Sequence, residues 1–146
     1  MQFNKLIPEL SVTNISLSKS FYVDVLKFKL EYERMEDNFA FLSYNGSQIM
    51  LEQINDNWNT GVLEKPFGRG INFQIETTEI FELKKRLNQN NYPLFKDIFE
   101  SNYKVNNQIF KEIEFLVLDP DGYLLRFQQT IKVSNKNQFK YNKKEI

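Results

Sequence analysis

The alternation of apolar and polar residues divides the chain into two runs of similar pattern. In each run a short strand pattern precedes a helical pattern, and three more strand patterns follow. The predicted strands cover residues 6–13, 29–33, 39–44 and 48–54, and then 70–76, 93–99, 112–118 and 124–131. The predicted helices cover residues 16–27 and 78–89. The pattern therefore predicts two βαβββ units in tandem.

Turn signals support the boundaries between these segments. The Asn-Gly pair at residues 45–46 favours a tight hairpin, because a type I′ turn needs positive φ at both central residues. The Asp-Pro-Asp-Gly sequence at residues 119–122 predicts a second tight turn. A polar loop over residues 55–69 joins the two units and contains the only tryptophan, Trp58.

Two such units predict an α+β fold in which open curved sheets form a cup. A single helix cannot cover both faces of the sheet in its unit, so the concave face must contact the other unit, a partner chain or a ligand. We expect one domain over residues 1–131, with units at about 4–54 and 70–131, and a basic tail over residues 132–146.

Charge is distributed unevenly although the formal net charge of the 146 residues is zero. The tail holds five lysines and one glutamate, so the remaining residues carry 14 basic and 18 acidic side chains. We interpret the tail as a solvated end, and we expect no nucleic-acid partner because the rest of the chain offers no basic face. The acidic body favours a cationic ligand.

The chain contains no histidine and no cysteine. This excludes most zinc sites, thiol nucleophiles, disulfides and histidine-based acid–base chemistry. No apolar run approaches the roughly 20 residues that span a membrane, and the N-terminus lacks a signal-peptide pattern. We therefore expect a cytoplasmic protein without a membrane partner.

Two sequence segments resemble a known superfamily. Residues 12–15, 18, 20–22 and 25–28 resemble the opening of vicinal-oxygen-chelate proteins, the superfamily of glyoxalases and antibiotic resistance proteins, and residues 118–127 resemble its final hairpin. The resemblance covers about residues 4–131 and implies the same tandem fold.

Enzymes of that superfamily hold a metal ion on strands that face the concave cavity. The resemblance places three of their ligand positions near Ile7, near Gly70 and at Arg126. An aliphatic side chain, a hydrogen atom and a guanidinium do not bind a divalent cation, so we expect no metal and no other cofactor. An oxygen-only metal site stays open as an alternative, with the possible ligands Glu9, Glu52, Gln53 and Gln128.

A closer resemblance is to the bleomycin resistance proteins, carried by residues 36–42, residues 48–52 and Trp58. It implies a homodimer that binds and sequesters the antibiotic without altering it, in two clefts at the subunit interface. Aromatic side chains stack there on the flat bithiazole of the drug, and acidic groups face its cationic tail. On this interpretation the protein is not an enzyme.

The resemblance carries aromatic positions over to Phe39, Trp58 and Phe110, the last of which is a tryptophan in several members. The full set of predicted ligand-binding residues is Phe39, Glu52, Trp58, Tyr103, Phe110 and Arg126.

Each of these residues also has a structural interpretation. One of Phe39 and Phe41 is expected to face the helix side as core, Trp58 could pack in a dimer, and Arg126 could pair with Glu52 or Glu9. Residues 100–108 are expected to form a polar loop, with Tyr103 either in the cleft or on its surface. Two alternative functions stay open, namely an enzyme of the same superfamily and a binding protein for another small aromatic metabolite.

Overall fold

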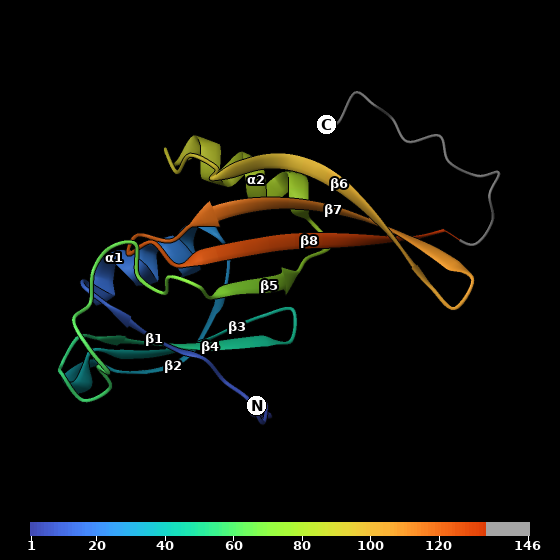
Figure 1. Ribbon diagram of the computed structural model, residues 1–146. Coiled ribbons are helices and arrows are strands. Elements are labelled where there is room, and N and C mark those ends of the chain that lie inside the picture. Colours follow the sequence, from blue (N-terminus) through green and yellow to red (C-terminus); the bar gives the residue numbers. More distant parts are fainter. Residues whose placement is uncertain (134–146) are drawn as a thin grey trace.

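The structure is a computed structural model that describes residues 1–133 (Figure 1). Its elements follow the same order twice. The first unit contains β1 (Glu9–Val12), α1 (Ile15–Lys19), the π-helix η1 (Ser20–Val25), β2 (Lys29–Arg34), the 3-10 helix η2 (Met35–Asp37), β3 (Phe39–Tyr44) and β4 (Ser47–Gln53). The second unit contains β5 (Asn72–Glu76), α2 (Ile80–Gln89), β6 (Lys96–Val105), β7 (Gln108–Leu118) and β8 (Leu124–Val133).

The strands form two four-stranded sheets with the same topology. The strand orders are β1-β4-β3-β2 and β5-β8-β7-β6. In each sheet the first strand of the unit pairs in parallel with the last, and the other pairs are antiparallel. The predicted α+β fold of two βαβββ units is therefore confirmed. No helix of the described residues is both long and apolar enough to cross a membrane.

Local sequence signals explain where several elements begin and end. Asn14 caps α1 by accepting a hydrogen bond from the Leu17 N–H at 3.0 Å. The predicted helix over residues 16–27 is in fact α1 followed by η1, and the chain leaves η1 through Lys27 at a φ of 65°. Asn45 and Gly46 both adopt positive φ between β3 and β4, as a type I′ turn requires.

The prediction of a polar loop over residues 100–108 is wrong. β6 and β7 continue through this segment as a hairpin, which extends beyond the end of β5 in Figure 1. Asn106 and Asn107 supply the two positive φ angles of its turn. β8 ends at Val133, so the first two residues of the predicted tail belong to a strand. The rest of the tail lies outside the described residues.

One apolar core joins the two units. It contains buried side chains from both sheets, from η1 and from α2, and Leu125 and Phe127 of β8 belong to it. Ala40 and Leu42 of β3 also face this core. Phe39 and Phe41 therefore both point to the opposite side, because residues two apart on a strand share a face. The prediction that one of the two phenylalanines faces the helices is wrong. We call the side away from the helices the helix-free face of each sheet.

Hydrogen bonds from the turn before β8 connect the second unit to the first. The buried Asp121 carboxylate accepts hydrogen bonds from the Thr13 N–H at 3.1 Å and from the Thr13 hydroxyl at 2.6 Å. The Tyr123 hydroxyl donates to the carbonyl oxygen of Ser11 at 2.9 Å. The turn therefore links the start of β8 to the end of β1 and to the residue that follows it.

Candidate functional site

Three of the six predicted ligand-binding residues meet on the helix-free face of the first sheet. Phe39 and Glu52 are cross-strand neighbours in β3 and β4. The loop after β4 brings Trp58 back to the same place, and the indole N–H of Trp58 donates a hydrogen bond to Glu52 Oε2 at 3.0 Å. The Trp58 residue is 66% exposed. An aromatic ring open to solvent is thus tied to a strand carboxylate.

Phe39 is covered by neighbours from its own chain. The guanidinium carbon of Arg34 lies 3.9 Å from the centroid of the Phe39 ring, and the Tyr32 ring lies 5.9 Å away. Only 4% of Phe39 is exposed. Arg34 was not among the predicted site residues, although its place at the end of β2 puts it opposite Phe39 in the register. A ligand could stack on this face of Phe39 only if Arg34 moved, so the stacking role of Phe39 stays a prediction.

Glu9 of β1 completes this group. Its carboxyl group is hydrogen-bonded to that of Glu52 on the neighbouring strand. Partial burial, the hydrogen bond and the negative charge of Glu52 together raise the pKa of Glu9 to about 7, while the charge of Arg34 opposes this rise. The pKa of Glu52 is lowered by hydrogen bonds from Glu9 and Trp58 and from Asn55, whose amide donates at 2.8 Å. Below about pH 7, the two carboxyl groups therefore share one proton.

This shared proton predicts a pH-dependent stability. Because folding raises the pKa of Glu9, the protonated Glu9 carboxyl group stabilises the folded protein. This contribution is complete below 4.5, the pKa of Glu9 in the unfolded chain, and it is lost as the pH rises through about 7. Between pH 5 and pH 8, we expect the unfolding free energy of the wild type to fall by about 1 kcal/mol more than that of Glu9→Gln. This difference is smaller than the free energy that corresponds to the full pKa shift, because solvent screens the exposed Glu9.

Urea denaturation at several pH values measures the difference. Glu36→Gln, which changes an exposed glutamate in η2, serves as the control and should follow the wild-type slope. Equal slopes for Glu9→Gln and the wild type would show that Glu9 does not retain its proton on folding.

The other three predicted residues lie on the helix-free face of the second sheet. Tyr103 and Phe110 are cross-strand neighbours in the β6–β7 hairpin. Their rings are stacked, with centroids 5.3 Å apart and planes inclined by 14°, and Tyr103 is 41% exposed. Stacked cross-strand rings stabilise a hairpin by themselves. The partly exposed Tyr103 also offers an aromatic side chain to a planar ligand.

Arg126 connects three strands of the second sheet. Its Nε and Nη2 donate to Glu114 Oε1 of β7 at 3.3 Å and 3.1 Å. Its guanidinium also donates to Asn72 and Gln74 of β5, at 3.2 Å and 2.7 Å. The expected pairing with Glu52 or Glu9 is wrong, because both glutamates belong to the other sheet.

Glu114 was not predicted as a site residue. The sequence feature that could have indicated its role is a charged residue within a predicted strand, between the core residues Ile113 and Phe115 of β7.

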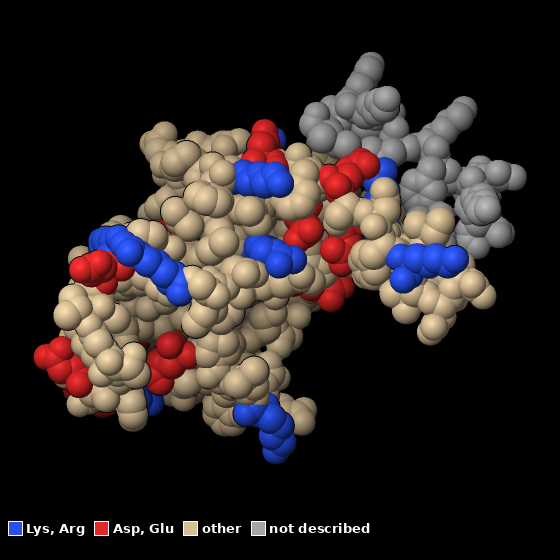
Figure 2. Space-filling view, viewed as in Figure 1, with Lys and Arg blue, Asp and Glu red and all other residues tan. Residues whose placement is uncertain are grey.

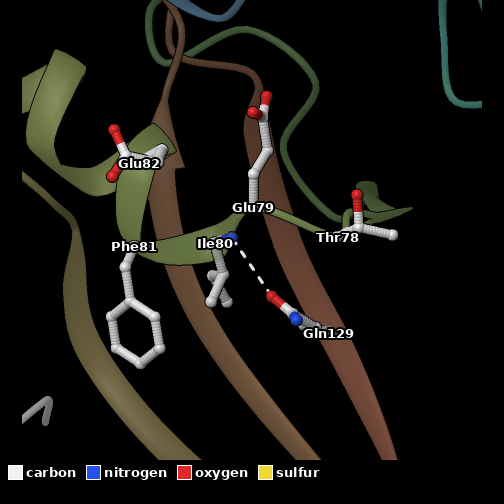
Figure 3. A pocket seen from close by; sticks show the side chains of 6 residues that line it. All are labelled: Thr78, Glu79, Ile80, Phe81, Glu82 and Gln129. Carbon is white, nitrogen blue, oxygen red and sulfur yellow. Dashed lines mark hydrogen bonds between the residues drawn. The ribbon is translucent and has the colours of Figure 1, made fainter.

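Three hollows among the described residues lie elsewhere. One of them has a volume of about 490 Å³ and lies at the start of α2, lined by Thr78, Glu79, Ile80, Phe81, Glu82 and Gln129 (Figure 3). In it, the Ile80 N–H donates to Gln129 Oε1 at 3.2 Å. None of the six predicted residues lines any of the three hollows. On the face shown in Figure 2, acidic and basic side chains are interspersed, and the coloured residues form no uniform basic patch.

The chain is similar in sequence to known proteins. No protein-family model matches the chain. A bleomycin resistance protein from Geobacillus stearothermophilus is 34% identical over 131 residues, which are 86% of this chain and 96% of the relative. A bleomycin resistance protein from Staphylococcus aureus matches to the same extent.

The chain belongs to the bleomycin resistance protein family. Solved structures agree with the fold of this family. A glyoxalase/bleomycin resistance protein/dioxygenase from Alicyclobacillus acidocaldarius is 22% identical, with a TM-score of 0.57 and coverage of 86% of this chain and 90% of that chain. A virulence protein from Salmonella typhimurium is 20% identical, with a TM-score of 0.63 and coverage of 90% of this chain and 100% of that chain.

The four oxygen donors considered for a metal do not meet in this member of the bleomycin resistance protein family. Gln53 accepts a hydrogen bond from the Ile15 N–H at 3.2 Å at the start of α1. Gln128 lies on β8 in the other sheet and accepts from Thr130 at 2.9 Å. Glu9 and Glu52 alone are neighbours. Among the described residues, no three Asp or Glu side chains are grouped to hold a metal ion.

Proposed function

We propose that the protein binds and sequesters an antibiotic of the bleomycin class without altering it, and thereby confers resistance. The observation that carries this proposal is the exposed indole of Trp58, fixed to Glu52 on a helix-free sheet face, in a chain of the bleomycin resistance protein family. A flat heteroaromatic ligand would stack on Trp58, and each stack would contribute about 0.5–1.5 kcal/mol beyond the burial of area.

The proposed binding unit is a homodimer. The aromatic and acidic residues divide into one group on each sheet, Phe39, Glu52 and Trp58 on the first and Tyr103 and Phe110 on the second. Two copies related by a two-fold axis would bring the first group of one protomer against the second group of its partner, and the symmetry would generate two equivalent clefts. The exposed fractions of Trp58 and Tyr103 support such an interface.

Electrostatics support a cationic ligand. Residues 1–131 carry four more acidic than basic side chains, Glu52 contacts Trp58, and Glu9 contacts Glu52. Such a surface accelerates the association of a cation, and this acceleration falls with ionic strength.

Sequestration needs no bond making, so we expect mass spectrometry to recover the antibiotic unchanged after long incubation. A change in its mass would contradict the non-catalytic part of the proposal and would make Glu9, with its pKa of about 7, the first acid–base candidate.

Titration of Trp58 fluorescence with bleomycin tests binding directly, since Trp58 is the only tryptophan. We expect quenching that saturates with a Kd well below 10 µM, and protection of susceptible cells that express the protein. A Kd above about 10 µM corresponds to only about 7 kcal/mol and would contradict sequestration. Absence of both quenching and protection would favour a binding protein for another small aromatic metabolite. Fluorescence could also be quenched without stacking on Trp58. Calorimetry on Trp58→Phe controls for this, because the substitution should weaken binding if the ligand stacks on the indole.

A further inference from the structure

Trp58 is held in place mainly by polar contacts. The residue is 66% exposed, so little packing restrains the rotation of its indole. The hydrogen bond from Nε1 to Glu52 Oε2, at 3.0 Å, attaches the ring by its edge. Because most of Trp58 is exposed, a planar molecule can reach the residue from solvent.

Glu52 is a rigid point of attachment. It lies in β4, which pairs with β1 on one side and with β3 on the other, where its register partners are Ser11 and Phe39. Its second oxygen, Oε1, accepts from the Asn55 amide at 2.8 Å, and Asn55 Oδ1 in turn accepts from the Asn57 N–H at 3.0 Å. One carboxylate thus holds both the start of the loop and the ring that the loop carries.

We propose that Glu52 is a positioning residue, whose carboxylate fixes the indole edge of Trp58 so that the ring is already oriented when a planar ligand arrives. The inference rests on the proposed function for its ligand. Orientation before binding lowers the entropy lost when the complex forms. Glu9 supports the arrangement, because its carboxyl group is hydrogen-bonded to the same side chain.

This role differs from attraction between the Glu52 charge and a cationic ligand, and two substitutions separate them. Glu52→Gln removes the charge but keeps a carbonyl oxygen that can accept from the indole N–H. Glu52→Ala removes both. Positioning predicts that the two variants differ, whereas charge attraction predicts that they lose affinity equally.

The first measurement needs no ligand. We expect Glu52→Ala to lower the fluorescence anisotropy of Trp58 and to increase its quenching by acrylamide, while Glu52→Gln stays close to wild type. Glu64→Ala removes a carboxylate with 71% exposure from the same loop and should leave both signals unchanged. Unchanged anisotropy and quenching in Glu52→Ala would overturn the proposal.

The second measurement uses bleomycin and calorimetry. We expect a loss of about tenfold in affinity for Glu52→Ala and of less than about threefold for Glu52→Gln, because a hydrogen bond to a charged acceptor is worth a factor of this order. In a Trp58→Phe background, Glu52→Ala should have less than about a threefold effect, since no indole remains to be held. Equal losses in Glu52→Gln and Glu52→Ala would overturn the proposal. If the wild type binds no bleomycin, the proposed function fails, and the ligand-free anisotropy still decides whether Glu52 positions Trp58.

Discussion

Arg126→Met is expected to lower the free energy of unfolding by about 3 kcal/mol. The substitution removes the guanidinium that pairs with Glu114, whose side chain is 7% exposed, and leaves a nearly buried carboxylate without an ion-pair partner. It also removes the donor that the side-chain oxygens of Asn72 and Gln74 accept from. Urea denaturation at neutral pH measures the loss as a lower midpoint at an unchanged slope.

Two further variants test the cause. Arg126→Met combined with Glu114→Met removes the stranded charge, so we expect most of the stability to return. Arg69→Met serves as the control, because the Arg69 side chain is 61% exposed and its ion pair with Glu64 spans 4.0 Å. We expect this control to lose less than about 1 kcal/mol. If the double variant were as unstable as Arg126→Met alone, the hydrogen bonds to β5 would be the main contribution of Arg126.

The same contacts bear on ligand recognition. Arg126 was predicted to contact a ligand, and the structure shows its donors used between β5, β7 and β8. A guanidinium that already binds a carboxylate and two amide oxygens has little capacity for a further anion. Arg126 therefore contributes to the second helix-free face chiefly by ordering the sheet, and its contact with a ligand stays a prediction.

The periodic segments of the chain could be predicted from sequence because their signals are local. The strand over residues 39–44 is a short apolar run, and the Asn-Gly turn after it depends on positive φ; both signals are read within a few residues. The inner parts of β6 and β7 were predicted, but the outer part of their hairpin was missed because it projects from the sheet and is exposed on much of its surface. Polar residues dominate residues 100–108, so this segment has no long apolar alternation, and Asn106 and Asn107 form its turn.

Partners across the sheets could not be predicted in the same way. Glu9, Glu52 and Glu114 were chemically equivalent partners for Arg126, and only the pairing of β7 with β8 selects Glu114. Similarly, the register of β2 with β3 places Arg34 over Phe39. Burial of Phe39 by a cation from its own chain follows from this tertiary register, and sequence spacing does not specify it.

Gly122→Ala is expected to lower the free energy of unfolding by about 4 kcal/mol. Gly122 has a φ of 97° in the turn before β8, where an L-residue is strained by roughly 1–2 kcal/mol. A Cβ atom there would lie 2.5 Å from Cβ and 2.6 Å from Cα of Pro66. Relief of this contact requires a shift of the loop or of the turn, and overpacking of this kind adds about 1–3 kcal/mol.

Gly46→Ala is the matched control for Gly122→Ala. Gly46 has a φ of 83°, and a Cβ added there would meet no atom within 4 Å, so only the backbone strain applies. Thermal and urea unfolding of both variants should differ by at least about 2 kcal/mol. The additional loss of stability in Gly122→Ala measures how closely the turn packs against Pro66. The same turn carries Asp121, which contacts Thr13, and leads into Tyr123, which contacts Ser11. Equal losses would mean that the turn moves away from Pro66 at no cost, and the link between the two units would then tolerate this displacement.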